Sequence, residues 1–104
     1  MNEISKDADK LICCVYKTYL ERRKDGMSKE DAKQFYEGFH TSDEKLSKWI
    51  RDDISETLLE LQRAKYIRLD LSENFRLTDS LIIYMEQRFK NGLLDVVDLV
   101  SKFI

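Results

Sequence analysis

The chain contains no proline and only three glycines in its 104 residues. So few residues of these two types argue against a loop-rich or disordered protein. No stretch approaches 18 consecutive apolar residues, and a transmembrane helix is therefore not expected. The N-terminal residues show no basic segment followed by an apolar run, so we expect no secretory signal.

Residues that carry catalysis or bind metals are also scarce. His40 is the single histidine, and the chain has no spaced cysteine pair and no Gly-rich phosphate loop. A zinc site needs three or four ligands. Asp52 and Asp53 are adjacent, and a helix would turn them about 100° apart, so they do not form a catalytic pair. We therefore expect a protein that is not an enzyme, with no cofactor and no metal site.

The two cysteines, Cys13 and Cys14, are neighbours in the sequence. Adjacent cysteines do not build a disulfide framework, and this usage is typical of the reducing cytoplasm. The favoured interpretation is that both are small apolar residues on a buried helix. The alternative is redox sensing or cross-linking of a dimer.

Charge of one sign is not concentrated in any segment. The 18 basic and 20 acidic side chains are interspersed, and the formal net charge is -2. Such a balance does not predict an extended positively charged surface that binds nucleic acid. The length and the 42% hydrophobic content fit a single domain over residues 1–104 with a real core.

Apolar residues recur at helical spacing in the first third of the chain. Ser5 is placed to cap a helix at about 5–24, and a glycine follows that helix. Ser28 begins a second helix, expected over 28–37, which would bury Phe35.

A third apolar stripe runs through residues 43–65. Thr41 or Ser42 is placed to cap it, and the pattern predicts one long helix. A break near residues 51–53 is the alternative, because the stripe is least regular there.

The period of the apolar residues changes from helical to two after Tyr66. Alternation over 66–71 and 75–78, around a short turn at 72–74, predicts a two-stranded β-hairpin. An isolated hairpin is marginal in water, so we expect it to lie on the helices. The side chains expected to face the core are Ile67, Leu69, Leu71, Phe75 and Leu77.

Two further helices are expected after the hairpin. Thr78 caps the first, whose buried stripe is Leu81, Ile82, Met85 and Phe89. The second, 93–104, is more apolar than packing on one neighbour requires. It is the predicted seam of a homodimer, formed by Leu93, Val96, Val97, Val100 and Phe103. The alternative is that this helix folds back onto the first helix of the same chain.

The segment LLELQRAKYIRLDLSENFRLTD, residues 58–79, resembles the winged-helix (winged helix-turn-helix) superfamily. In that family a recognition helix ends in an apolar and charged run, a Tyr-Ile pair opens the wing, and a Leu-Thr pair closes it. Lys65 stands where the family often has glycine. The layout over about 5–90 is also similar to that of small bacterial and phage YjcQ-type proteins. The resemblance implies a mainly α fold with a small two-stranded β-hairpin and additional C-terminal helices.

Winged-helix proteins usually bind duplex DNA, so the resemblance implies a bacterial or phage transcriptional regulator. The third helix would enter the major groove, the wing would hold the backbone, and a dimer would set the half-site spacing. Carried over by position, the candidate DNA-binding residues are Lys45, Lys48, Arg51 and Ser55 on the third helix, and Arg68 and Arg76 on the wing.

Carboxylates lie beside these candidate residues and oppose the approach of phosphate groups. They are Asp43, Glu44, Asp52, Asp53 and Glu56 near the third helix, and Asp70 and Glu73 near the tip of the wing. The alternative function is therefore a winged-helix protein-interaction module, which does not bind DNA and docks a partner through its wing or its terminal helix.

Overall fold

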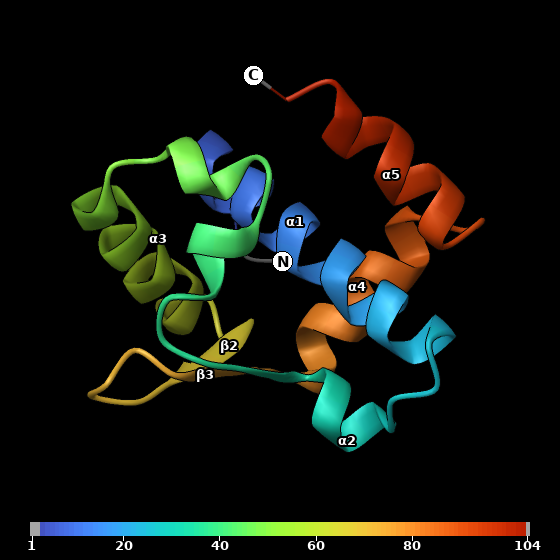
Figure 1. The fold of residues 1–104 in the computed structure, drawn as a ribbon, viewed down its shortest axis with the longest axis horizontal. Helices are drawn as coiled ribbons and strands as arrows, with labels where there is room; N and C mark the ends of the chain where they lie inside the picture. Colours follow the sequence, from blue (N-terminus) through green and yellow to red (C-terminus); the bar gives the residue numbers. More distant parts are fainter. Residues whose placement is uncertain (1–2, 104) are drawn as a thin grey trace.

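The structure, a computed structural model, describes residues 3–103. Figure 1 shows α1 through the middle of the molecule, with α3 on one side and α5 on the other. No helix within the described residues is both long and apolar enough to cross a membrane. The elements in chain order are α1 (Lys6–Lys24), α2 (Lys29–Ala32), β1 (Gln34–Phe35), the 3-10 turns η1 (Phe39–Ser42) and η2 (Leu46–Lys48), α3 (Arg51–Arg63), β2 (Ile67–Leu69), β3 (Phe75–Leu77), α4 (Asp79–Arg88) and α5 (Leu93–Ser101).

Helix α1 confirms the prediction for the first helix. The Ser5 hydroxyl accepts a hydrogen bond from the Ala8 N–H at 3.1 Å, and Gly26 follows the helix with a φ of 98°. Arg88 of α4 donates to both carboxylate oxygens of Asp9, at 2.5 and 3.1 Å, and so ties α4 to α1. The side chains that α1 buries in the core are Ala8, Leu11, Ile12, Cys13, Cys14, Val15, Tyr16 and Tyr19.

Both cysteines lie in this core as free thiols. Burial raises the pKa of Cys13 and of Cys14 to about 12, so each thiol stays protonated at neutral pH. Their position agrees with the interpretation of two small apolar residues on a buried helix.

The helix predicted over 28–37 is wrong beyond its first turn. Ser28 does cap it, with its hydroxyl accepting from the Asp31 N–H at 3.1 Å, but the helix ends at Ala32. The chain then enters β1, where the Phe35 ring stacks on Phe75 with centroids 5.0 Å apart. Pairing with a strand 40 residues away decides this conformation, and the local pattern cannot show it.

The single helix predicted over 43–65 is also wrong, and the alternative break near 51–53 is close to the observed start at Arg51. The Asp43 carboxylate accepts from two backbone N–H groups, those of Lys45 and Leu46, and so starts the short turn η2. Residues 49 and 50 are extended, and this segment places Leu46 in the core with no exposed surface. Burial of Leu46 outweighs the local preference for a continuous helix.

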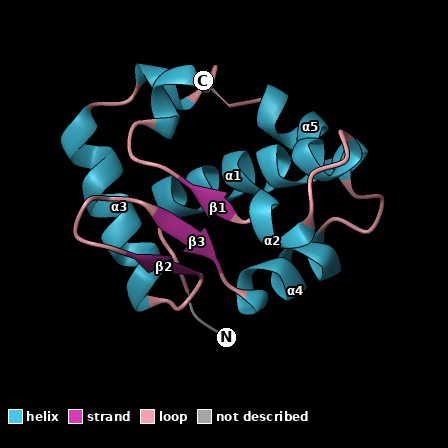
Figure 2. Cartoon of the chain, turned by 60° about the horizontal axis from the view of Figure 1, so that its bottom comes forward, coloured by secondary structure: helices cyan, strands magenta, loops and turns pink. Residues whose placement is uncertain are grey.

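The predicted hairpin is confirmed, and the structure adds a third strand. Strands β2 and β3 pair antiparallel, β1 pairs with the other edge of β3, and the sheet order is β1-β3-β2 (Figure 2). Phe35, Ile67, Phe75 and Leu77 are buried and Leu69 is partly buried. The prediction for Leu71 is wrong, because the strand ends at Leu69 and Leu71 is fully exposed in the turn.

Polar side chains cover the two outer edges of this sheet. The Arg22 guanidinium donates to the carbonyls of Ala32 and Gln34, at 3.2 and 2.8 Å, beside β1. The Gln62 side chain accepts from the Leu69 N–H at 2.8 Å beside β2. Both contacts occupy groups that another strand would otherwise pair with, so the edges are protected against strand addition.

Helix α4 begins as predicted, with the Thr78 hydroxyl accepting from the Leu81 N–H at 3.3 Å. The four residues of its predicted stripe, Leu81, Ile82, Met85 and Phe89, are all buried.

The final helix, α5, folds back onto α1 of the same chain. Val96 and Val100 are buried in the core, and Leu93 and Phe103 pack partly against it. The proposed seam is therefore corrected at Val96 and Val100, because residues buried within one chain are not available to a second copy. Of the five seam candidates, Val97 keeps the most exposed side chain.

Candidate functional site: the α3–hairpin face

Helix α3 has one buried side and one side that points to solvent. The buried residues are Ile54, Thr57, Leu58 and Leu61. Turning 100° per residue places the opposite stripe at Asp52, Glu56, Leu59 and Arg63, all of which are exposed. Asp52 lies in the first turn, where a carboxylate also suits the helix dipole. The outward stripe of α3 thus carries two carboxylates, one leucine and one arginine.

The hairpin is fastened to the side of α3. The Ser55 hydroxyl donates to the Glu73 carboxylate at 2.6 Å, and the Arg51 guanidinium lies 3.9 Å from the same carboxylate. Arg51 also pairs with Glu37, on the segment that follows β1, at 3.2 Å. These contacts hold the tip of the hairpin beside the beginning of α3.

The turn of the hairpin is organised by one carboxylate. Asp70 accepts hydrogen bonds from the backbone N–H groups of Ser72 and Asn74, at 2.8 and 3.0 Å, and from the Asn74 side-chain amide at 3.2 Å. Desolvation would raise the pKa of Asp70, but these hydrogen bonds outweigh it and hold the pKa below its ordinary value. The Asn74 side chain also accepts from the Glu37 N–H at 2.9 Å. These hydrogen bonds therefore hold the turn in one conformation.

One leucine side chain is exposed on the turn of the hairpin and another on α3. Leu71 projects fully from the turn, and Leu59 is 43% exposed. Leu59 is four residues after Ser55 and three before Gln62, both of which contact the hairpin, so helix geometry places it toward the hairpin. We call the surface formed by Asp52, Glu56, Leu59, Arg63 and the turn residues 70–73 the α3–hairpin face.

The structure does not gather the predicted DNA-binding residues on one helix face. Lys45 and Lys48 precede α3, at η2, and the Lys45 ammonium donates to the Phe103 carbonyl at 2.9 Å. Arg51 and Ser55 are engaged by carboxylates, as described above. The placement of Lys45 and Lys48 on the third helix is therefore corrected, because that helix begins only at Arg51.

The two wing arginines do come together. Arg68 and Arg76 are directly opposite each other in the β2–β3 pairing, on the outer face of the sheet. Arg76 forms an ion pair with Glu30. Within residues 3–103, the side chains of Lys48 and Arg68 are the ones among the six candidates that form no hydrogen bond or ion pair. Sequence alternation puts each arginine on the polar side of its strand, but only the register makes them neighbours.

The single histidine contributes to the core. His40 is buried, and its ring meets the Phe39 ring edge-on with centroids 6.0 Å apart. Among the described residues there is no group of three or more histidine, cysteine, aspartate or glutamate side chains that can hold a metal ion.

Comparisons of the chain with protein-family models, with curated proteins and with solved structures found no match.

Proposed function

We propose that this chain is a winged-helix protein that acts as a protein-interaction module, with the α3–hairpin face as its docking surface. The order of α3, β2, β3 and α4 supports the winged-helix assignment. The presence of β1 as a third strand beside β3 is compatible with it.

The observation that carries the function is the chemistry of the exposed groups on this face. Leu59 and Leu71 are exposed, and Asp52 and Glu56 share the outward stripe of α3 with Leu59, while the nearby Arg51 is held by carboxylates. Exposed apolar groups rimmed by polar ones are typical of protein interfaces. Carboxylates oppose phosphate groups, so the same face is poorly suited to a DNA groove. The complementary partner is a protein surface that offers apolar groups flanked by lysine or arginine.

A differential capture experiment tests this function. Leu71→Asp is expected to abolish retention of a partner, because it puts a charge where an apolar contact forms. The expected loss of affinity is about tenfold or more, as for a central interface residue. The measurement is capture from a lysate of the source cells at moderate salt, followed by titration of the purified captured protein against each variant.

Leu94→Asp is the matched control, because Leu94 is also an exposed leucine but lies on α5, outside the α3–hairpin face. Binding that survives in Leu94→Asp and is lost in Leu71→Asp supports the proposal. If no captured protein depends on Leu71, the α3–hairpin face is not a docking surface.

A second candidate function is DNA binding by a homodimeric regulator. It is favoured by the free side chains of Lys48 and Arg68 and by the pairing of Arg68 with Arg76. A gel-shift assay with random duplex at low salt separates the two functions. The interaction module is expected to give no retardation. DNA binding would give retardation that falls steeply with salt and is reduced by Lys48→Glu or Arg51→Glu.

We further propose a cytoplasmic, non-catalytic protein. Two free cysteines in the core are compatible with a reducing compartment. Its role is then docking rather than chemistry.

A further inference from the structure

The outer face of the sheet holds an unfavourable arrangement of charge. The register sets Arg68 of β2 directly opposite Arg76 of β3. Like charges at directly opposed positions of an antiparallel pair destabilise it. Nothing in the core requires either arginine, because the buried side chains of these strands point to the other face. Packing of the core therefore does not explain why two cations stand at this position.

Other cations surround this pair. Lys33 donates to the Asp79 carboxylate at 2.8 Å, and Arg76 pairs with Glu30. The Lys33 side chain is only 12% exposed, whereas the two carboxylates are 75% exposed at Glu30 and 80% exposed at Asp79. Ion pairs with such exposed carboxylates are weak, because water screens the charges. A second anion can therefore exchange with either carboxylate at little cost.

The carboxylate of Asp79 responds to the positive charge around it. The hydrogen bond from Lys33 and the charge of Lys33 lower the pKa of Asp79 and outweigh desolvation, and Lys29 and Arg68 lower it further by smaller amounts. An anion at this place is thus stabilised by Lys33 and, to a smaller extent, by Lys29 and Arg68.

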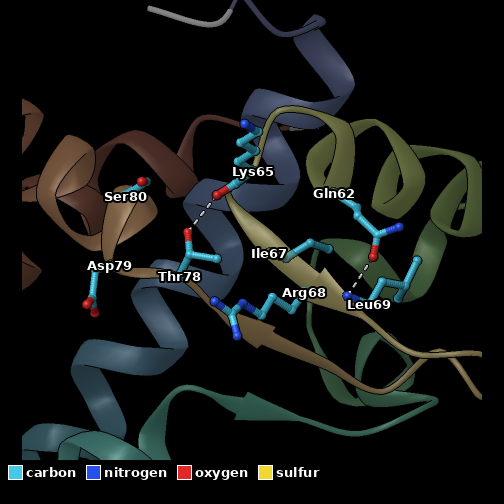
Figure 3. Close-up of a pocket in the computed structure, with 8 residues that line it drawn as sticks. All are labelled: Gln62, Lys65, Ile67, Arg68, Leu69, Thr78, Asp79 and Ser80. Atoms are coloured by element: carbon cyan, nitrogen blue, oxygen red, sulfur yellow. Dashed lines mark hydrogen bonds between the residues drawn. The ribbon is translucent and has the colours of Figure 1, made fainter.

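Arg68 lies where two recesses in the surface adjoin. One recess, of about 520 Å³, is lined by residues of α3, β2 and the beginning of α4. The other, of about 240 Å³, is lined by Glu30, Lys33, Arg76 and their neighbours, and both include Arg68, Thr78 and Asp79. Figure 3 shows the Arg68 side chain extended from β2 toward Thr78 and Asp79, whereas the Lys65 side chain points away.

The geometry points to a binding site for a small phosphate monoester where these two recesses adjoin, with Arg68 and Arg76 on the phosphate group and Lys33 beside them. Arginine binds phosphate oxygens through paired N–H donors, and among residues 3–103 the Arg68 guanidinium donates no hydrogen bond and forms no ion pair. The ligand would displace Glu30 from Arg76 and leave the fold unchanged.

The recess fits a small molecule better than a polymer. The two arginines and Lys33 line the recess of about 240 Å³. The adjoining recess of about 520 Å³, which shares Arg68, lies within the range of small-molecule sites, about 300–1,000 Å³. Glu30 and Asp79 lie beside the arginines and would repel the further phosphates of a nucleic acid strand. A monoester carries close to two negative charges at neutral pH, with a second pKa near 6. A phosphodiester carries only one, and so gains less from the arginine pair.

The test is an NMR titration of the full chain with inorganic phosphate and with glucose 6-phosphate, with glucose as the neutral control. We expect both phosphates to shift the backbone amides near Arg68, Arg76 and Ser80, and glucose to shift none. Arg68→Glu is expected to weaken binding at least about tenfold, the loss of one charge-assisted contact. Asp79→Asn is expected to strengthen binding, because it removes the competing carboxylate. Binding should also weaken as the pH falls from 7.5 to 5 and the ligand takes up its second proton.

Lys48→Glu is the matched control, because Lys48 is an exposed and unpaired cation at η2. It changes the net charge as Arg68→Glu does and should leave the titration unchanged. The site is refuted if the phosphates cause no shift at 20 mM, a concentration on the order of a very weak site. Equal binding by Arg68→Glu, or shifts caused by random duplex DNA but not by glucose 6-phosphate, also refutes it. Leu71→Asp, which tests the docking face, should leave phosphate binding intact, so the two proposals fail separately.

Discussion

Val96→Asp is expected to remove a large part of the protein's free energy of unfolding, whereas Val97→Asp should leave it nearly unchanged. Val96 of α5 has no exposed surface, and α5 lies against α1, so the substitution forces an unpaired carboxylate into the core. Loss of the buried valine and desolvation of the charge together cost about 4–5 kcal/mol. A domain of this size has a total stability of only about 5–15 kcal/mol. Urea unfolding followed by circular dichroism measures the difference.

Val97→Asp is the matched control for Val96→Asp. Val97 is on the same helix, and its side chain is 39% exposed. Val97→Asp introduces the same charge and should cost about 1 kcal/mol or less. A dimer held together by the whole apolar helix predicts instead that both variants dissociate while their chains stay folded. Sedimentation of the wild-type chain and the two variants separates these outcomes.

Phe75→Ala is expected to have the second largest effect, about 3–5 kcal/mol of lost stability. The Phe75 ring is buried between Phe35 and Phe39, with both centroids 5.0 Å away, stacked on the first and edge-on to the second. It is the point where β1, β3 and η1 meet. Its removal leaves a cavity and takes away the aromatic contacts that hold the third strand. A thermal melt should show a midpoint lower by well over 10 °C, on the scale of about 4–8 °C per kcal/mol.

Leu71→Ala is the matched control for this substitution. Leu71 lies in the same hairpin but is fully exposed, so its loss should change stability by no more than about 0.5 kcal/mol. Amide hydrogen exchange adds a second readout. In Phe75→Ala, the amides of residues 33–35 and 75–77 should lose protection before those of α1. Uniform loss of protection through the whole chain would contradict the role assigned to the aromatic cluster.

The local pattern was sufficient where one element carries its own capping group. Ser5, Ser28 and Thr78 each accept the hydrogen bond expected of a helix N-cap. The alternation after Tyr66 predicts the hairpin, because apolar residues at every second position lie on one face of a β-strand. These features depend on neighbours a few residues away, which the sequence displays directly.

Local sequence patterns did not predict which residues of the candidate sites lie together. Arg68 and Arg76 were both identified as exposed cations, but their direct opposition follows from the strand register. The engagement of Arg51 and Ser55 by Glu73 follows from the way the hairpin lies along α3. The residues that meet are 8 positions apart in the first case and 18 or 22 positions apart in the second, and charge counting along the chain does not reveal such contacts.

The amino-acid order by itself determined that this is a helical domain with one β-hairpin, and it determined where the capped helices begin. Hydrogen bonds and burial within one or two turns are strong enough to fix those features. Only the tertiary structure decided that residues 34–35 form a strand, that α3 starts at Arg51 and that α5 covers α1. In each case the burial of a large apolar side chain against a distant element outweighs a local preference worth only about 1 kcal/mol or less per residue.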